Sequence, residues 1–428
     1  MTLTLTSAPT ESQVFEGTVA VVGLGYIGLP TAVALATRGV HVIGIDVNEA
    51  VVSSVSRGEV PFVEPDLAVA TRGAVSMGRL TATTQMPHAD AYVVAVPTPF
   101  GPDHTADLSY VRSAVDAIAP MLVGGELVIL ESTSPPGTSH QMSEWLAERR
   151  PDLTFPHAGE GFPDVNIAHC PERVLPGRIM IEMVTNDRVV GGLTPACAQR
   201  AAALYRLFCQ GQIHVTDAAS AEMAKLVENA FRDVNIAFAN ELSLICDQLK
   251  LDVWEVIAMA NRHPRVNILN PGPGVGGHCI AVDPWFIVGA APETSRLIRT
   301  AREVNNGKPH AVVHNIVRAA RKFREPTIAV LGLAFKANID DLRESPAVEI
   351  LRLISAELPE ARLLVSEPFI AALPPTLSEL PNVQLSTLND VIEQSDIVAL
   401  LVDHDHFRAV NRSRLAGRIV FDTRGIWR

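Results

Sequence analysis

Residues 19–30 read VAVVGLGYIGLP, an apolar run that leads directly into glycines at positions 23, 25 and 28. The run predicts a buried β-strand, and the residues after Gly28 predict a helix. Between a strand and a helix, the spacing G-x-G-x-x-G permits a tight turn. It also lets a pyrophosphate approach bare backbone at the positive end of the helix. This stretch therefore predicts a doubly wound α/β domain that binds a dinucleotide.

An acidic residue at the end of the second predicted strand supports this prediction. Asp46 closes the run HVIGID, where a carboxylate can bind the two hydroxyls of an adenosine ribose and repel a 2′-phosphate, so NAD is favoured over NADP. The segments VPTP at 96–99 and ESTSPPGT at 131–138 follow strand-like runs, at the edge where doubly wound sheets bind ligands. The residues expected to contact NAD are Gly23, Gly25, Tyr26, Ile27, Gly28, Asp46, Pro97, Thr98 and Thr133.

Strand-like and helical stretches alternate in two parts of the chain, which predicts a parallel sheet with helices on both faces in each part. Between them, residues 220–249 contain neither Gly nor Pro and have apolar residues at helical spacing, so they predict one long helix, buried between domains or against a second copy. The fold class is α/β, with two Rossmann-like doubly wound domains joined by this helix and a helical segment. The expected division is a flexible tail at 1–16, a nucleotide-binding domain at 17–215, a central helical domain at 216–324 and a second α/β domain at 325–428.

Composition excludes several classes of protein. The 428 residues carry a net charge of -12 and no basic patch, which argues against a nucleic-acid partner. No apolar run reaches the roughly 18 residues that a membrane span needs, and the first seventeen residues lack the features of a secretion signal, so the cytoplasm is expected. The five cysteines are scattered, so we expect neither a disulfide framework nor a metal, and the run DHDHF at 403–407 is interpreted as a surface loop.

Two groups of residues outside the nucleotide-binding turn are candidates for chemistry. Lys225 and Asn229 share one face of the long helix, and a cation beside an amide can stabilise an oxyanion; a solvated lysine and an exposed asparagine are the alternative. In GPGVGGHCIAVDPWF at 272–286, four glycines precede Cys279, and Asp283 follows it. Bare amides can approach a substrate, so this loop favours an active thiol over inert packing or a metal pair with His278. The other four cysteines are expected in the core.

The chain resembles the UDP-glucose/GDP-mannose dehydrogenase family over nearly its whole length. The resemblance rests on VVGLGYIGLPTA, ESTSPPGT, HCPERVLPG, KLVENAFRDVNIAFANEL, GVGGHCIAVDPWF and GLAFKANIDDLRESPA. It implies an NAD-binding amino-terminal domain, a central segment that builds a homodimer, and a carboxyl-terminal domain that binds a UDP-sugar. It also implies oxidation of a primary alcohol at C6 to a carboxylate with two NAD and one water. NRHPRVNILNPGPGVGGHCIAVDPWFIV favours UDP-N-acetyl-D-mannosamine, in surface polysaccharide synthesis; UDP-N-acetylglucosamine and UDP-glucose are alternatives.

The resemblance also implies roles for single residues. An aldehyde yields a second hydride only after a nucleophile has added to it, and Cys279 would be that nucleophile, through a thiohemiacetal and a thioester. Lys225 and Asn229 would stabilise the oxygen, Asp283 and Thr133 would position or deprotonate water, and Glu172 would act in hydrolysis. Pro176 stands where UDP-glucose dehydrogenases often carry a second glutamate, four residues after the first, which leaves the hydrolytic base open. The residues expected to bind the substrate are Glu172, Arg173, Lys225, Asn229, Arg265, Gly276, Lys336 and Arg424.

Two other functions fit parts of the same pattern. A β-hydroxyacid dehydrogenase also combines a nucleotide domain with a Lys-x-x-x-Asn helix face, but it transfers one hydride and needs no thiol. A nucleotide-sensing or scaffold protein would need none of the reactive groups. Lys225, Asn229, Cys279 and Asp283 occur together here, which favours the dehydrogenase.

Overall fold

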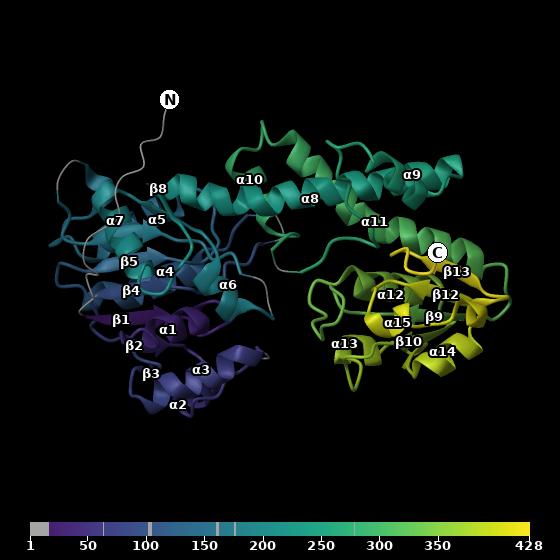
Figure 1. Ribbon diagram of the computed structural model, residues 1–428, viewed down its shortest axis with the longest axis horizontal. Coiled ribbons are helices and arrows are strands. Elements are labelled where there is room, and N and C mark those ends of the chain that lie inside the picture. The colour runs from purple at the N-terminus through teal and green to yellow at the C-terminus, as the bar shows by residue number, and fades with distance from the viewer. Residues whose placement is uncertain (1–16, 63, 102–104, 160–161, 175–176, 278) are drawn as a thin grey trace. The chain divides into compact units, whose positions relative to one another are not determined.

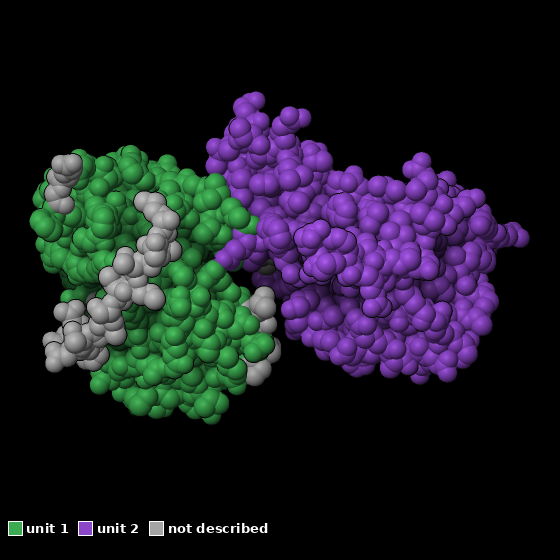
Figure 2. Space-filling view, turned by 45° about the horizontal axis from the view of Figure 1, so that its top comes forward, with its two compact units in different colours: residues 1–227 green, residues 228–428 purple. Residues whose placement is uncertain are grey.

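The computed structural model describes residues 17–62, 64–101, 105–159, 162–174, 177–277 and 279–428. The tail predicted at 1–16, together with Pro176 and His278, lies outside the described residues. The chain divides into two compact units, residues 1–227 and 228–428, which Figure 2 colours separately. Helix α8 (Ala218–Leu249) crosses the boundary between them and confirms the predicted long helix.

The first unit is built on an eight-stranded sheet in the order β3-β2-β1-β4-β5-β6-β7-β8 (Figure 1). Strand β7 runs antiparallel to β6, whereas the other neighbouring pairs are parallel. The predicted parallel sheet is therefore confirmed, with the β6–β7 pair as an exception that the sequence did not indicate. The strands are β1 (Thr18–Val22), β2 (His41–Ile45), β3 (Leu80–Thr83), β4 (Ala91–Val94), β5 (Leu127–Leu130), β6 (Asn166–His169), β7 (Arg188–Gly192) and β8 (Ile213–Asp217).

Helices cover both faces of this sheet, because successive residues of each strand point to opposite sides. Val19 and Val21 belong to the core under α1, α3, α6 and α7, whereas Ala20 and Val22 belong to the core under α4 and α5. Every residue of α1 is buried. The helices of this unit are α1 (Gly28–Ala36), α2 (Glu49–Ser56), α3 (Pro65–Ser76), α4 (Ser109–Ile118), α5 (Thr138–Arg149), α6 (Ile179–Thr185) and α7 (Pro195–Tyr205), with short 3-10 turns at Ala119–Met121 and Pro156–Ala158.

In the second unit, buried polar contacts join α8 to α11 (Arg296–Ala320). Asp233 forms an ion pair of 2.6 Å with Arg302, and Asn305 donates to the same carboxylate. Asn240 donates to Asn305 and accepts a hydrogen bond of 2.9 Å from the backbone of Gly272. These contacts tie the loop that leads to Cys279 onto the helices. Two shorter helices, α9 (Val253–Ala260) and α10 (Asp283–Ala290), flank that loop.

The second unit also contains a parallel sheet in the order β11-β10-β9-β12-β13, as expected for a second α/β domain (Figure 1). Its strands are β9 (Thr327–Leu331), β10 (Arg362–Ser366), β11 (Val383–Leu385), β12 (Ile397–Leu400) and β13 (Ile419–Asp422). Its helices are α12 (Pro346–Glu357), α13 (Pro375–Ser378), α14 (Leu388–Gln394) and α15 (Asp405–Arg408), with a 3-10 turn at Arg412–Leu415. In the part of the chain that is described, no helix has the length and apolarity to cross a membrane.

The run DHDHF at 403–407 is not the surface loop that its composition predicted. His404 and Phe407 are fully buried. The His404 ring accepts from the backbone of Asn338 at Nδ1 and contacts the Glu367 carboxylate at 3.1 Å through Nε2. Asp403 pairs with Arg424. The run joins β12 to α15, with Asp403, His404 and Phe407 packed in the second domain and Asp405 and His406 exposed.

Candidate active site

The glycine turn after β1 has the geometry that its sequence predicts. Gly23 has a φ of +95°, and a Cβ there would lie 2.5 Å from the carbonyl oxygen of Ala95. A Cβ on Gly28 would lie 1.8 Å from the carbonyl oxygen of Gly23. A Cβ on Gly25 would meet no atom within 4 Å. Gly23 and Gly28 are therefore required by close packing, whereas Gly25 faces open space in which a ligand can approach the backbone.

The end of β2 lies against this turn. The carboxylate of Asp46 accepts a hydrogen bond of 2.9 Å from the backbone of Leu24 and another from the backbone of Asn48. Ile27 is the residue before α1, and Tyr26 stacks on Phe62 with ring centroids 4.1 Å apart. The acidic group and the turn, which the sequence places on separate strands, are thus in direct contact.

Two further loops at the same edge are joined to each other. The hydroxyl of Thr98, after β4, donates to the carbonyl of Thr133, after β5, at 2.6 Å. Ser132 donates to the carbonyl of Val96, and Pro97 is exposed. The strand order reverses between β1 and β4, and such a switch point is where doubly wound sheets bind ligands. The structure therefore brings the predicted NAD contacts together at one place in the first unit.

Glu172 is buried and held on both oxygens. Its Oε2 accepts a hydrogen bond of 2.8 Å from Arg188, and its Oε1 accepts from the backbone of Arg173. Arg188 also lies over the ring of Tyr205, 4.9 Å from its centroid. The Arg173 guanidinium donates to the backbone carbonyl of Asp187. The sequence analysis missed Arg188, because nothing near it in sequence marks its partner.

Glu131 contacts Tyr205, the residue whose ring lies under Arg188, and was also missed as a functional candidate. Its carboxyl accepts from the hydroxyls of Thr31 at 3.0 Å and Tyr205 at 3.1 Å. Complete burial, and to a smaller extent the charge of Glu172, raises the pKa of Glu131 to about 8. A neutral carboxylic acid therefore connects the nucleotide-binding helix α1 to the pair formed by Glu172 and Arg188. The only signal in the sequence is an acidic residue at the end of an apolar strand.

In the second unit, three predicted residues come together at the start of α10. Cys279 is exposed, and its carbonyl accepts a hydrogen bond of 2.9 Å from the backbone of Asp283. The Asp283 side chain is buried and accepts a hydrogen bond of 2.5 Å from the side-chain amide of Asn229. Lys225 lies one turn before Asn229 on α8, so the two residues share a helix face. The thiol of Cys279 and the carboxylate of Asp283 therefore lie at the start of α10, and the amide of Asn229 on α8 contacts that carboxylate.

The glycines before Cys279 have a packing role that the sequence did not reveal. A Cβ on Gly274 would lie 2.8 Å from Pro346, and one on Gly276 would lie 2.3 Å from the carbonyl oxygen of Glu344. Gly277 has a φ of +85° and packs on Phe335. The loop runs so close to the carboxyl-terminal domain that side chains larger than hydrogen would collide with it. Approach to a substrate is therefore not the only reason for these glycines.

Two predicted substrate residues line one small cavity of about 30 Å³ in the second unit, together with Pro273 and Gly274. Lys336 is exposed, and Arg424 donates to Asp403 at 2.9 Å. Arg265 is exposed after α9 and forms no side-chain hydrogen bond or ion pair with any described residue. The structure thus brings Lys336 and Arg424 together but not Arg265.

The remaining cysteines lie where the sequence predicts them, with Cys170, Cys197 and Cys246 buried and Cys209 half-buried. Within the described ranges, no group of three or more His, Cys, Asp or Glu side chains could hold a metal ion.

Comparison with known proteins assigns the three parts of the chain. Residues 17–209 match the NAD binding domain of the UDP-glucose/GDP-mannose dehydrogenase family, residues 219–307 its central domain and residues 329–428 its UDP binding domain. The chain belongs to this family. It is therefore an NAD-dependent nucleotide-sugar dehydrogenase, and the resemblance drawn from its motifs is confirmed.

Relatives of this dehydrogenase carry two different names. An NDP-N-acetyl-D-galactosaminuronic acid dehydrogenase from Ralstonia nicotianae is 58% identical over 96% of both chains. A UDP-N-acetyl-D-mannosamine dehydrogenase from Escherichia coli is 54% identical over 96% of this chain and 99% of its own. Among solved structures, a UDP-D-ManNAc dehydrogenase from Pyrococcus horikoshii is 38% identical over 96% of both chains, with a TM-score of 0.84. These matches confirm the α/β fold.

The residues at the switch point fit NAD. Gly25 leaves open space beside the amino-terminal end of α1, where the backbone can bind a pyrophosphate. Asp46 is held by Leu24, so its carboxylate stands beside the turn where a ribose would lie. When NAD is bound, it supplies the acceptor for a hydride from the substrate.

Proposed function

We propose that this dehydrogenase oxidises the C6 hydroxyl of a UDP-N-acetylhexosamine to a carboxylate, in two hydride transfers to NAD. The observation that carries the proposal is the grouping of Cys279 with Asp283 and Asn229, because a single alcohol oxidation needs no thiol. The match of residues 329–428 to a UDP binding domain supports a UDP-sugar as the substrate. The net reaction consumes one water and two NAD and yields one carboxylate, two NADH and three protons.

In this proposal, the Cys279 thiolate forms a bond to C6 of the aldehyde that the first oxidation leaves. The carbonyl oxygen becomes an alkoxide of a thiohemiacetal, which loses hydride from C6 to become a thioester. Water then adds to the thioester, and the thiolate leaves with the carboxylate as product. Lys225 and Asn229 stabilise the oxygen that gains charge at each addition. Asp283 and Thr133 position or deprotonate the water.

Glu172 enters the proposal as a carboxylate of fixed orientation. Its Oε2 accepts from Arg188 and its Oε1 accepts from the backbone of Arg173. Both oxygens of Glu172 thus already accept hydrogen bonds from groups of the protein. We therefore assign deprotonation of the water to Asp283, and to Glu172 the orientation of the group that is hydrolysed.

We propose UDP-N-acetyl-D-mannosamine as the sugar, in line with the relatives that bear its name. The galactosaminuronic acid dehydrogenases at 58% identity favour a second candidate, UDP-N-acetylgalactosamine, which the sequence analysis did not consider. The two sugars differ in configuration at C2 and C4, whereas the chemistry at C6 is the same. In either case we place the product in surface polysaccharide synthesis and the enzyme in the cytoplasm.

We also propose that the enzyme is a homodimer that forms through α8. Large apolar side chains recur on this helix and are exposed in the single chain, at Phe231, Phe238, Ile245 and Leu249. Their spacing of seven, seven and four residues places them on one face. A second copy of the same helix would remove this face from water by pairing it with itself, as in a symmetric dimer.

A panel of UDP-sugars assayed for NADH tests the proposed reaction. We expect two NADH per molecule of the preferred UDP-N-acetylhexosamine, and an acidic product by mass spectrometry. UDP-xylose, which lacks C6, is the matched control and should give no NADH. One NADH per sugar, with an aldehyde product, would reject the double oxidation and favour a single-step dehydrogenase.

A further inference from the structure

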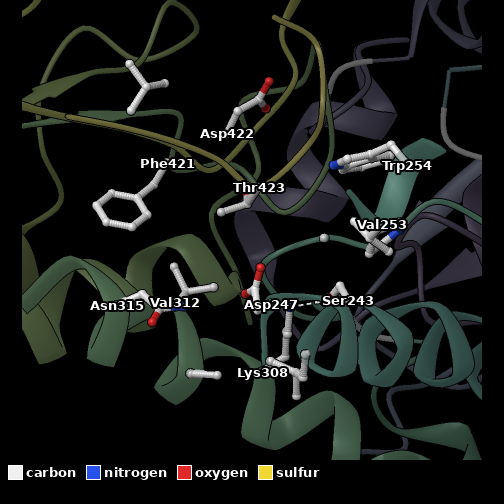
Figure 3. Close-up of a pocket in the computed structure, with 15 residues that line it drawn as sticks. Ser243, Asp247, Val253, Trp254, Lys308, Val312, Asn315, Phe421, Asp422 and Thr423 are labelled. Carbon is white, nitrogen blue, oxygen red and sulfur yellow. Dashed lines mark hydrogen bonds between the residues drawn. The ribbon is translucent and has the colours of Figure 1, made fainter. Parts of the chain in front are cut away.

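A second cavity in the carboxyl-terminal unit is lined by two residues, 271–272, of the loop that leads to Cys279. It has a volume of about 220 Å³ and is bounded by α8, α9, α11, β13 and residues 271–272 (Figure 3). It shares no lining residue with the smaller cavity of Lys336 and Arg424. At ~30 Å³ per water molecule, the space corresponds to about seven waters, enough for a small organic ligand.

A buried lysine forms one side of this cavity. Lys308 is 7% exposed, and its ammonium donates a hydrogen bond of 2.5 Å to Ser243. The Ser243 hydroxyl in turn donates to the carbonyl of Asn240. The other two N–H groups of Lys308 have no partner among the described residues. Burial lowers the pKa of Lys308 to about 8, so the amine is still mostly charged at neutral pH. An anion that accepted the remaining N–H groups would stabilise this buried ammonium, because a buried charge is costly unless it is paired.

An aspartate on the same cavity provides the opposite charge without neutralising the lysine. Asp247 lies one turn after Ser243 on α8 and is exposed. Its carboxylate forms no ion pair with Lys308 in the described structure, although its charge acts on the lysine. The other acid of the cavity, Asp422, is already satisfied by the backbone N–H groups of Arg424, Gly425 and Trp427. The cavity thus holds a cation, Lys308, and a carboxylate, Asp247, that are not paired with each other, and Asp422 is a second carboxylate that backbone donors already satisfy.

Apolar and aromatic side chains form much of the remaining wall, which also includes Asn315 and Thr423. Figure 3 shows Val312 and Phe421 on one side of the two charged groups and Trp254 on the other. The indole N–H of Trp254 has no hydrogen-bond partner among the described residues. A ligand in this space would therefore meet the two charges and, on either side of them, apolar and aromatic side chains.

We propose that this cavity binds a small zwitterion, an α-amino acid with an apolar or aromatic side chain. Its carboxylate would accept the two unused N–H groups of Lys308, and its ammonium would pair with Asp247. Its side chain would pack on Val312, Phe421 and Trp254. A carboxylate without an ammonium group would meet the uncompensated charge of Asp247, and an amine without a carboxylate would leave the charge of Lys308 without an anionic partner.

The bound amino acid would touch the loop that carries the thiol. Gly272 lines the cavity, and its backbone N–H donates to Asn240 on α8. Cys279 follows on the same loop. The inference does not rest on the proposed oxidation, because binding is measured without turnover.

Isothermal titration calorimetry of the full chain with L-phenylalanine and L-leucine tests the proposal. We expect saturable binding of at least one of them. Against L-phenylalanine, the matched compounds are 3-phenylpropionate, which lacks the ammonium group, and phenethylamine, which lacks the carboxylate. Each should bind at least about tenfold more weakly. Lys308→Met and Asp247→Asn should each weaken amino-acid binding by about tenfold or more. Lys322→Met, an exposed lysine just after α11, should leave binding unchanged.

A variant that keeps both charges separates loss of the site from loss of the fold. Ala311 lines the cavity, so Ala311→Leu should fill it and abolish binding while thermal unfolding stays cooperative. Absence of heat with both amino acids up to about 10 mM would overturn the proposal. Equal binding of 3-phenylpropionate, or binding that persists in Ala311→Leu or Lys308→Met, would overturn it too.

Discussion

The side-chain amide of Asn229 donates a hydrogen bond of 2.5 Å to Oδ2 of Asp283, across 54 positions of the chain. The contact fixes the orientation of the amide. The buried Asp283 carboxylate can only accept hydrogen bonds, so the NH₂ group of Asn229, and not its oxygen, must face it. One amide N–H of Asn229 is thereby engaged, and the second has no partner among the described residues. Asn229 can therefore orient the carboxylate and still donate to an oxygen of the substrate.

Removal of this amide should act on turnover more than on the fold. We expect Asn229→Ala to lower kcat by about 100-fold, because a preorganised donor is lost where oxygen gains charge. The effect of Asp283→Ala in the Asn229→Ala background should be smaller than in the wild type, because the two residues act as a pair. Asn235→Ala is the control, since Asn235 lies on the same helix and donates to a backbone carbonyl. Additive losses in kcat would show that the pair is not coupled.

Replacement of the thiol separates the two oxidations. Cys279→Ser nearly preserves volume, but a hydroxyl is a far weaker nucleophile at neutral pH. We expect the variant to bind NAD and UDP-sugar and to lose steady-state turnover by at least about 1000-fold. Cys209→Ser, at a half-buried cysteine, should retain turnover. Uronate formation by Cys279→Ser at the wild-type rate, with two NADH per sugar, is incompatible with a covalent thioester.

The charge of Asp46 should set the choice of cofactor. Asp46→Asn keeps an oxygen that can accept from the backbone of Leu24 but removes the charge that opposes a 2′-phosphate. We expect the ratio of kcat/KM for NAD over NADP to fall by about tenfold or more. Asp90→Asn, whose carboxylate accepts from the backbone of Thr18 at the start of β1, serves as the control. An unchanged ratio would remove Asp46 from the ribose site.

The buried acid Glu131 should make stability depend on pH. Its pKa is about 8 in the folded protein and close to 4.5 when exposed, because burial disfavours the charge. The folded protein then binds more protons than the unfolded chain between these values, so the free energy of unfolding falls as pH rises through this window. Glu131→Gln remains neutral and should lack this loss. Near pH 8 the variant should be more stable than the wild type, on the order of a few kcal/mol.

Chemical denaturation at several pH values measures this difference. The groups that face Glu131 are Glu172, Arg188, Cys170 and Tyr205, and all are unchanged in the variant. Glu148→Gln, on an exposed side chain, should follow the wild type. Parallel curves for wild type and Glu131→Gln would mean that Glu131 is ionised in the folded protein.

The apolar face of α8 should hold two copies together. Phe231 is 70% exposed in the single chain, so Phe231→Glu would bury a carboxylate at the proposed interface. We expect wild type to sediment as a dimer and the variant as a monomer, at concentrations of about 10 μM. Phe162→Glu is the control, because Phe162 is 98% exposed and is not part of α8. A wild-type monomer, or a dimer that survives Phe231→Glu, contradicts the proposal.

Several features of this protein could be derived from the sequence because each depends on local pattern. The turn at Gly23 needs a positive φ and a close approach of backbone, and glycine is the residue that permits both. The long helix α8 follows from apolar spacing without Gly or Pro. The motifs around Cys279 and Lys225 were sufficient to indicate the family, because these motifs are short stretches of sequence and do not depend on contacts between distant residues.

Other features were decided only by the tertiary structure. An apolar strand has the same pattern whether its neighbour runs parallel or antiparallel, so the reversal of β7 against β6 could not be predicted. The pairing of Glu172 with Arg188, and of His404 with Glu367, likewise has no local signal. From sequence alone, a charged side chain is predicted to be exposed, because its burial is favourable only when a partner compensates for the hydration that it loses. That compensation comes from residues distant in sequence, and only the folded chain brings them together.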